Sequence, residues 1–325
     1  MKKIFVSSRS FGRFSKEPEE MISQIAEIEK STFGRPLKEE DLVDVLPNYD
    51  GIIVGVDEIT KRALETSDRL KVVAKHGAGV DNIDLKAATE RGVIVTYVPG
   101  ANAESVADFT IGLILALARN IVPAHYSTKE GKWESRKFMG TEIYGKTLGI
   151  IGIGTIGKKV VKRAKGFDMK IICNTGHPEK HKEFADEYGI EFVDLPTLLK
   201  ESDIVSIHCS LNAKTEGLIG EKEFSIMKDT AFLINTARGP IVDENAAYQA
   251  LKEKKIAGAA FDVYKNEPPG ASNPLYELDN VILAPHIGSY TTEALNRVDI
   301  IQAQDIIKAL KGERPQFVAN TEMFE

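Results

Sequence analysis

Three glycines in the middle of the chain, Gly152, Gly154 and Gly157, have the spacing G-x-G-x-x-G and directly follow a short apolar run. Where such a motif joins a strand to a helix, the first glycine permits a tight turn, the second lets the backbone approach a pyrophosphate, and the third lets the helix pack closely on the strand. A helical stretch at residues 158–165 and a second apolar run at residues 170–173 follow here. The motif therefore predicts a dinucleotide-binding βαβ unit, with the pyrophosphate on the N–H groups at the start of the helix.

The first hundred residues alternate between short apolar runs and helical stretches, which is typical of a parallel sheet covered by helices. The expected strands are residues 3–7, 51–55, 71–74 and 93–97, and the expected helices are residues 17–30, 39–46, 61–65 and 84–91. This first unit is small and lacks a phosphate-binding glycine loop after its first strand.

Pro99 and Gly100 interrupt the alternation, and a long helix is expected at residues 103–119. It is apolar on nearly every side from residue 111 to residue 118, so it is expected to be buried. Further strands are expected at residues 148–152, 170–173, 190–193, 204–209, 231–236, 257–261 and 281–284, and a last helix at residues 292–311. The predicted fold class is therefore α/β, with two Rossmann-like doubly wound parallel-sheet domains. A dinucleotide-binding domain, residues 100–289, is expected to be inserted into a smaller flavodoxin-like substrate-binding domain, residues 1–99 and 290–325.

Composition excludes several classes of function. The formal net charge is -6 and no basic run occurs, which argues against nucleic-acid binding. The longest apolar stretch, residues 111–118, is far shorter than the roughly 20 residues that span a bilayer. Cys173 and Cys209 lack a metal-binding spacing and no secretory leader precedes them, as is typical of free thiols in a reducing compartment. We therefore expect a cytoplasmic protein without metal, nucleic-acid or membrane partners.

Arg238, Glu267 and His286 each follow one of the last three expected strands. In an open α/β sheet, ligands bind at the carboxyl ends of the strands. Each residue alone has a structural alternative, since the Arg could form a surface ion pair, the Glu could be a loop carboxylate and the His could be structural. Together they place a cation, a carboxylate and a titratable base at one edge of a predicted dinucleotide-binding sheet.

Oxidation of a hydroxy acid needs this set of groups. The planar fork of Arg238 suits a substrate carboxylate, which it grips through two parallel hydrogen bonds. His286 would remove the hydroxyl proton as hydride leaves for the cofactor. Glu267 would hold the imidazole and favour its protonated form, because a nearby negative charge stabilises the imidazolium.

The sequence resembles the D-isomer-specific 2-hydroxyacid dehydrogenases over essentially its whole length, and among them the D-3-phosphoglycerate dehydrogenases and the hydroxypyruvate and glyoxylate reductases. The motifs that carry the resemblance are the glycine motif, His76-Gly-Ala-Gly-Val-Asp-Asn-Ile-Asp84, Gly131-Lys-Trp133, Lys137-Phe-Met-Gly140, Thr236-Ala-Arg-Gly239, Asp262 with Glu267-Pro-Pro269, and Pro285-His-Ile-Gly288.

The resemblance implies that Arg238, Glu267 and His286 are the catalytic residues. It also implies that the loop at residues 75–79 presents backbone N–H groups to the substrate carboxylate. The residues that would contact the substrate are Lys75, Gly77, Ala78, Gly79 and Arg238.

The same resemblance assigns a dinucleotide site. Asp262 would accept a hydrogen bond from the nicotinamide carboxamide, and Thr236 and Ala237 would line the ring. The residues that would contact the dinucleotide are Gly152, Gly154, Thr155, Ile156, Gly157, Asn174, Thr175, His177, Cys209, Thr236, Ala237, Asp262 and Gly288. Members of the family are usually homodimers joined around the long helix and Trp133, although ordinary core packing is an equal alternative for Trp133.

The sequence departs from the family pattern at the end of the second Rossmann strand. An acidic residue there normally binds the adenosine ribose and repels a 2′-phosphate. This chain has Thr175 at that position, and Thr175, His177, Lys180 and His181 could donate to a 2′-phosphate. NADP is therefore plausible as cofactor, and NAD with a weak ribose contact remains the alternative.

A second departure concerns a phosphorylated substrate. The arginine expected after the strand that ends near Gly55 is missing, and only Lys75, Arg136 and Lys137 remain as candidate cations. We therefore expect an NAD(P)-dependent D-2-hydroxyacid dehydrogenase that acts as a 2-oxoacid reductase, with a phosphorylated substrate left open. The alternative function is a non-catalytic, dinucleotide-sensing scaffold of the same fold, similar to a transcriptional corepressor.

Overall fold

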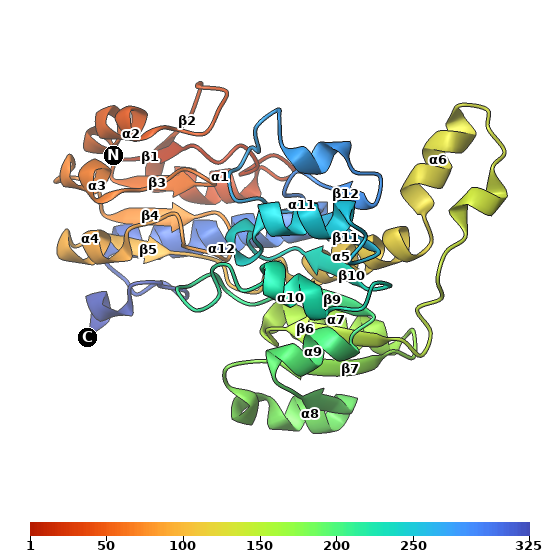
Figure 1. Cartoon of the computed structure of the whole chain (residues 1–325). Helices are drawn as coiled ribbons and strands as arrows, with labels where there is room; N and C mark the ends of the chain where they lie inside the picture. Colours follow the sequence, from red (N-terminus) through yellow and green to blue (C-terminus); the bar gives the residue numbers. More distant parts are fainter. The chain divides into compact units, whose positions relative to one another are not determined.

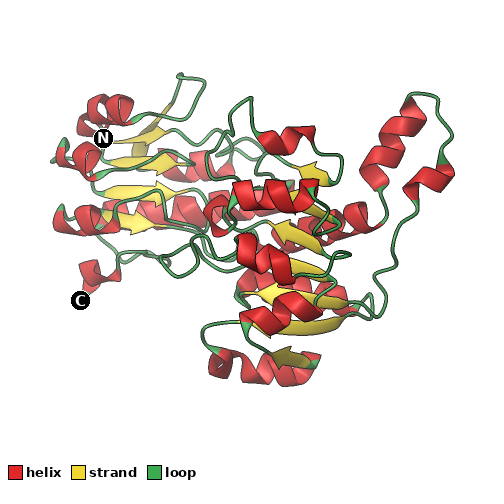
Figure 2. Cartoon of the chain, viewed as in Figure 1, coloured by secondary structure: helices red, strands yellow, loops and turns green.

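The computed structural model describes all of residues 1–325, and the chain divides into two compact units (Figure 1). Unit 1 comprises Met1–Asn102 and Tyr290–Glu325, and unit 2 comprises Ala103–Ser289. Each unit contains one parallel sheet with helices on both faces (Figure 2). The predicted α/β fold class with two doubly wound sheets is thereby confirmed.

The sheet of unit 1 has five parallel strands in the order β2-β1-β3-β4-β5, which is the flavodoxin-like order. These strands are β1 (Lys2–Val6), β2 (Ala26–Lys30), β3 (Gly51–Val54), β4 (Val72–Lys75) and β5 (Ile94–Thr96). All four residues of β3 are buried, as a central strand covered on both faces requires. The carboxyl ends of β1, β3 and β4 therefore meet at one edge of this sheet.

Helices cover both faces of this sheet. They are α1 (Glu17–Ser23), α2 (Glu39–Val45), α3 (Lys61–Glu65), α4 (Leu85–Glu90) and α12 (Thr292–Lys311). The long helix α12 packs on α1 and β4, so the end of the chain completes unit 1. Its buried Ala303 and Ile306 share one core cluster with Ile4 and Val72 of the sheet.

The helix expected at residues 17–30 is wrong. Helix α1 ends at Ser23, and residues Ala26–Lys30 form β2, which pairs with β1 along its whole length. Ala, Glu and Lys favour a helix locally, but an unpaired edge of β1 would leave a row of backbone groups without partners. The long-range pairing with β1 therefore overrides the local preference.

The sheet of unit 2 has seven parallel strands in the order β12-β11-β10-β9-β6-β7-β8. They are β6 (Thr147–Ile151), β7 (Lys170–Asn174), β8 (Ile190–Phe192), β9 (Ile204–Ile207), β10 (Phe232–Asn235), β11 (Gly258–Phe261) and β12 (Val281–Leu283). Strand order reverses between β6 and β9, and such a reversal is where doubly wound sheets bind ligands.

One face of this sheet is covered by α5 (Ala103–Ala118) and α7 (Thr155–Lys165), and α8 (Lys182–Tyr188) lies beside β8. The other face carries α9 (Leu195–Glu201), α10 (Glu221–Ile226) and α11 (Glu244–Lys252), whose Leu198, Phe224 and Ala247 belong to one core cluster. Helix α5 is buried along most of its length, as its apolar sequence predicted.

A segment of unit 2 after α5 extends away from the seven-stranded sheet (Figure 1). It contains α6 (Ile121–Lys129) and the short 3₁₀ helix η2 (Ser135–Phe138), and we call residues 121–139 the arm. Trp133 in the arm is 88% exposed, and Tyr126 and Met139 are exposed too. The core-packing alternative for Trp133 is therefore wrong.

No single helix is both long and apolar enough to cross a membrane. Helices α5 and α6 reach that length and composition only when they are taken together, and they are bent by 65° relative to each other.

Candidate active site

The glycine motif forms a compact loop between β6 and α7. Gly152 has φ +91°, and a Cβ at this residue would lie 2.5 Å from the backbone nitrogen of Cys209. A Cβ on Gly157 would lie 2.4 Å from the carbonyl oxygen of Gly152. Neither position can hold a side chain, so the loop and the first turn of α7 pack against each other and against the end of β9 at the reversal of strand order.

The start of α7 is open to a ligand. The helix begins at Thr155 rather than at the predicted residue 158, and its N-cap Gly154 provides no side-chain cap. A Cβ on Gly154 would meet nothing within 4 Å, and Gly154 and Thr155 are exposed. The first N–H groups of a helix lack intrahelical partners and attract negative charge. The residues present therefore fit the pyrophosphate of a dinucleotide.

The loop after β7 carries the residues expected near the adenosine ribose. The Asn174 side chain donates to the Val193 carbonyl at 2.9 Å, which fixes the end of the strand. Thr175 is half-buried, and Glu179, the first carboxylate after the strand, pairs with His177 at 3.3 Å. His181 has a buried Nδ1 without a hydrogen-bond partner, and burial, together with the charge of Lys158, lowers its pKa.

His208, which follows β9, was not predicted as a site residue. Its Nε2 lies 2.8 Å from the Ser206 hydroxyl, whereas its buried Nδ1 has no partner. Burial lowers the pKa of His208 to about 3, so the ring is neutral at pH 7. A buried polar atom without a partner beside the glycine loop is a natural contact for a bound ligand. The sequence signal for this site residue was a histidine at a strand end, directly before Cys209. Burial raises the pKa of the Cys209 thiol to about 11.

The turn after β10 is held by a buried side chain that was not predicted either. Asn235 accepts a hydrogen bond from the Ala237 backbone nitrogen at 3.0 Å and donates to the Arg238 carbonyl at 2.9 Å. The Thr236 hydroxyl lies 3.1 Å from that of Thr110 on α5. The backbone from which Arg238 projects is therefore fixed on both sides.

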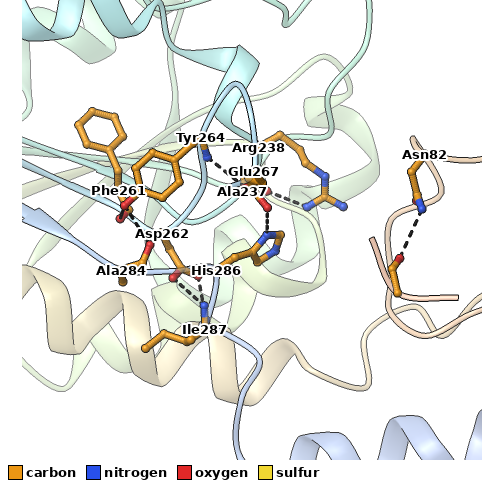
Figure 3. Close-up of polar contacts among 12 residues, drawn as sticks. Asn82, Ala237, Arg238, Phe261, Asp262, Tyr264, Glu267, Ala284, His286 and Ile287 are labelled. Atoms are coloured by element: carbon orange, nitrogen blue, oxygen red, sulfur yellow. Dashed lines mark hydrogen bonds and ion pairs between the residues drawn. The ribbon is translucent and has the colours of Figure 1, made fainter. Parts of the chain in front are cut away.

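Glu267 and His286 form a hydrogen-bonded pair (Figure 3). The Nδ1 atom of His286 lies 2.5 Å from Oε2 of Glu267, and the other carboxylate oxygen accepts from the Tyr264 backbone nitrogen at 3.1 Å. The two side chains are 40% and 28% exposed. Because Nδ1 faces the carboxylate, Nε2 is the ring nitrogen that can exchange a proton with a ligand.

The surroundings of Glu267 favour its ionised form. Burial by itself would raise the pKa of this carboxyl. The hydrogen bond and positive charge of His286, the Tyr264 N–H group and the charge of Arg238 act in the opposite direction, and the pKa lies below its ordinary value. Glu267 therefore faces His286 as a carboxylate at neutral pH, and Arg238 is close enough to contribute to this.

Asp262 holds the segment that carries His286. Its two buried carboxylate oxygens accept hydrogen bonds from the backbone nitrogens of Ile287 and Gly288, both at 2.8 Å (Figure 3). Burial raises the pKa of Asp262, and these two bonds partly oppose the rise. His286 has φ 54°, a conformation that non-glycine residues rarely adopt without support. Sequence reasoning did not predict this role. Each carboxylate oxygen keeps a lone pair that could accept a further hydrogen bond, such as the one expected from a nicotinamide carboxamide.

The predicted substrate loop, residues 75–79, belongs to unit 1 and follows β4. Lys75 contacts the carbonyl oxygen of Gly55 through Nζ, and the Val98 backbone nitrogen donates to the Gly77 carbonyl at 2.8 Å. Asn82, just after this loop, donates to the carbonyl oxygens of Gly55 and Asp57, which ties the segment that follows the loop to the end of β3. The other candidate cations, Arg136 and Lys137, lie exposed in the arm of unit 2.

Unit 2 thus brings together most of the residues that the sequence singled out. Arg238, Glu267 and His286 follow β10, β11 and β12, which are neighbours in the sheet. They supply a cation, a carboxylate and an imidazole at the same sheet edge as the open start of α7. This set can bind an acid group and move one proton next to a dinucleotide.

The sequence model of the family described as D-isomer specific 2-hydroxyacid dehydrogenase, NAD binding domain, matches residues 111–288. The chain is 44% identical to a D-3-phosphoglycerate dehydrogenase of Archaeoglobus fulgidus over 85% of its own length, but it spans only about half of that relative, 52%. It is 42% identical to a glyoxylate reductase of Thermococcus litoralis over 93% of both chains. Among solved structures, an acyclic imino acid reductase in complex with NADPH and D-Arg matches with a TM-score of 0.87 and 32% identity, covering 97% of this chain and 99% of the other.

Proposed function

Because the chain belongs to the D-isomer specific 2-hydroxyacid dehydrogenase family, we propose that it interconverts a small 2-hydroxy acid and the corresponding 2-oxoacid with a nicotinamide dinucleotide. The observation that carries this proposal is the hydrogen-bonded pair of His286 and Glu267 beside Arg238. In this proposal unit 2 is the dinucleotide-binding domain and unit 1 the substrate-binding domain.

The chain's own residues divide the proton and carboxylate chemistry between them. The bound dinucleotide supplies the hydride donor for reduction or the hydride acceptor for oxidation. During reduction, His286 donates a proton from Nε2 to the substrate oxygen, and during oxidation it takes the proton back. Glu267 fixes the ring through Nδ1, and Arg238 binds the substrate carboxylate with its planar fork. In unit 1, the backbone N–H groups of Ala78 and Gly79 are donors of the kind that bind a carboxylate, whereas those of His76 and Gly77 already donate to the carbonyl oxygens of Val54 and Lys75.

We infer that the physiological direction is reduction and that the substrate has a short side chain. Glyoxylate, hydroxypyruvate and phosphohydroxypyruvate form the panel to assay with NADH and with NADPH. A phosphorylated substrate has less support, because the loop after β3 carries the buried carboxylate of Asp57, which accepts from Ser7 Oγ at 2.6 Å and from Leu37 N at 2.7 Å. A dinucleotide-sensing scaffold is not favoured, since the relatives that match are named as enzymes.

We infer that NADPH is accepted as well as NADH. No carboxylate stands at the end of β7, where one would repel a 2′-phosphate. Thr175 offers a hydroxyl there, and Lys158 lies near enough to His181 to lower the pKa of its imidazole. Lys158 would offer a 2′-phosphate one positive charge. Thr175 and His181 would offer it two neutral hydrogen-bond donors.

We infer that the arm joins two copies of this chain in a homodimer. Its exposed Trp133, Tyr126 and Met139 lie on a segment that extends away from the core of its own unit. Exposed apolar groups of this kind mark interaction surfaces, and a second copy related by a two-fold axis is the commonest partner. The cytoplasmic location likewise stays a prediction, supported by the free thiols of Cys173 and Cys209.

Substitution of the proposed acid–base pair should separate its two members. His286→Ala should lower kcat for reduction by roughly 10²–10⁴-fold, the usual contribution of a positioned acid–base group, with little change in dinucleotide affinity. Glu267→Gln removes the negative charge beside the imidazole, which must carry the proton that reduction consumes. The alkaline limb of the kcat/KM profile for reduction should therefore move to lower pH. The control is Glu277→Gln, which alters an exposed carboxylate that is hydrogen-bonded to Tyr248. An unmoved pH profile in Glu267→Gln would contradict the pairing of Glu267 with His286.

Arg238→Lys should raise the KM for the 2-oxoacid by roughly one to two orders of magnitude while leaving dinucleotide dissociation nearly unchanged. Lysine keeps the charge but loses the two-pronged hydrogen bond to a carboxylate, and one bond to a charged group accounts for an effect of this size. Steady-state kinetics and dinucleotide titration measure the two quantities. A larger change in dinucleotide dissociation than in KM would move Arg238 to the nucleotide site.

Thr175→Asp should impair the use of NADPH and spare or improve the use of NADH, because the new carboxylate repels a 2′-phosphate and accepts from ribose hydroxyls. The measurement is kcat/KM for both dinucleotides with one 2-oxoacid. Thr175→Val is the matched control, since it removes the hydroxyl without adding charge. A strong NADH preference in the wild type that Thr175→Asp leaves unchanged would show that this position does not set selectivity.

The double substitution Trp133→Asp and Met139→Asp should convert the dimer into monomers, because two carboxylates cannot be buried without partners. Light scattering after gel filtration should give twice the chain mass of 35.8 kDa for the wild type and the single mass for the variant. Ile226→Asp, a substitution of an exposed apolar residue of unit 2 outside the arm, should leave the dimer intact. A wild-type monomer, or a variant that stays dimeric, argues against the arm as the interface.

A further inference from the structure

A histidine and an aspartate form a buried pair inside unit 1. His76 directly follows β4, and Asp299 lies in the first half of α12. The Nε2 atom of His76 lies 2.5 Å from Oδ1 of Asp299, and the two side chains are 4% and 0% exposed. Neither residue belongs to the catalytic set proposed above.

The other oxygen of Asp299 reaches a second loop. Oδ2 accepts a hydrogen bond at 3.0 Å from the backbone nitrogen of Gly12, in the loop after β1. The opposite nitrogen of the His76 ring lies 3.3 Å from the Ser10 hydroxyl in that same loop, and the Phe11 ring meets the imidazole edge-on. One carboxylate on α12 therefore ties together the loops that follow β1 and β4.

The pair acts on the loop that is proposed to bind the substrate carboxylate. The backbone nitrogen of His76 donates to the Val54 carbonyl at 2.8 Å, so the residue is anchored to β3 through its backbone and to α12 through its side chain. Lys75 and Gly77 are its direct neighbours, and Gly77 has φ +150°. The Gly77 backbone nitrogen donates back to the Lys75 carbonyl at 2.9 Å across His76, so a shift of His76 would carry the Gly77 peptide with it.

We propose that Asp299 and His76 are positioning residues that hold the loop of residues 75–79 in the conformation that binds the substrate carboxylate. This inference rests on the proposed function, because it assigns the pair to the substrate side of the same reaction. A buried carboxyl group is destabilising unless hydrogen-bond partners surround it, and here those partners come from the two loops. Loss of one donor or of the charge therefore loosens both loops together.

A second buried aspartate on the same helix provides a matched control. Asp305 is also fully buried, and its two oxygens accept from the backbone nitrogens of Gln316 and Phe317 at 2.7 and 3.0 Å. It holds the chain segment that follows α12 and has no contact with either loop. Asp299→Asn and Asp305→Asn remove the same charge from the same helix at similar burial.

The experiment compares these two variants in the full chain with the best 2-oxoacid of the panel. Asp299→Asn should raise the KM for the 2-oxoacid at least tenfold, leave kcat within about threefold, and leave the dinucleotide Kd unchanged. Asp305→Asn should lower the melting temperature to a similar extent with KM unchanged. A stability loss in both variants without a change of KM in Asp299→Asn would overturn the proposal and leave the pair a purely structural one.

Substitutions of the histidine keep the proposal testable if Asp299→Asn does not fold. His76→Gln retains an N–H donor that can reach Oδ1 of Asp299, whereas His76→Ala does not. The KM should rise clearly less in His76→Gln than in His76→Ala, and equal values would overturn the proposal. If the wild type reduces none of the 2-oxoacids, the proposed function fails and this proposal with it, whereas an active wild type with unmoved KM values refutes the positioning role alone.

Discussion

The parallel order of the seven strands in unit 2 is the constraint on which the candidate site depends. Parallel strands bring their carboxyl ends to one edge, and the loops after β6, β10, β11 and β12 all leave from it. This order brings residues that are far apart in sequence, those of the glycine loop and Arg238, Glu267 and His286, to the same edge of the sheet. The reversal of strand order between β6 and β9 then opens the space where the start of α7 can receive a phosphate.

Buried carboxylates fix loops at the strand ends of both units. Asp57, Asp262 and Asp299 are all at most 3% exposed, and each accepts hydrogen bonds from the backbone of a neighbouring loop. A buried carboxylate without partners is destabilising by several kcal/mol, so each one persists only while its loop keeps the conformation that supplies the donors. Irregular backbone, such as that of His286 at φ 54°, is held in this way without regular secondary structure.

Much of the fold could be predicted because its signals are local. Hydrophobic runs marked all the strands except β2, and the glycine motif marked the loop between β6 and α7. Strand β2 was missed because its sequence favours a helix and only its pairing with β1 makes it a strand. Asn235 was missed as a site residue because it acts by holding a turn through hydrogen bonds that no sequence pattern shows. His208 was missed because its role depends on a buried ring nitrogen without a partner.

The sequence by itself determined the fold class, the family and the residue types of the candidate site, because each depends on short motifs with fixed spacing. Only the tertiary structure decided which atoms face each other. It turned Nδ1 of His286 toward Glu267, gave Asp262 two backbone donors and joined His76 to Asp299 across 223 residues of chain. Such contacts are set by how a whole unit packs around a charge that cannot remain buried alone, and spacing along the chain does not record that packing.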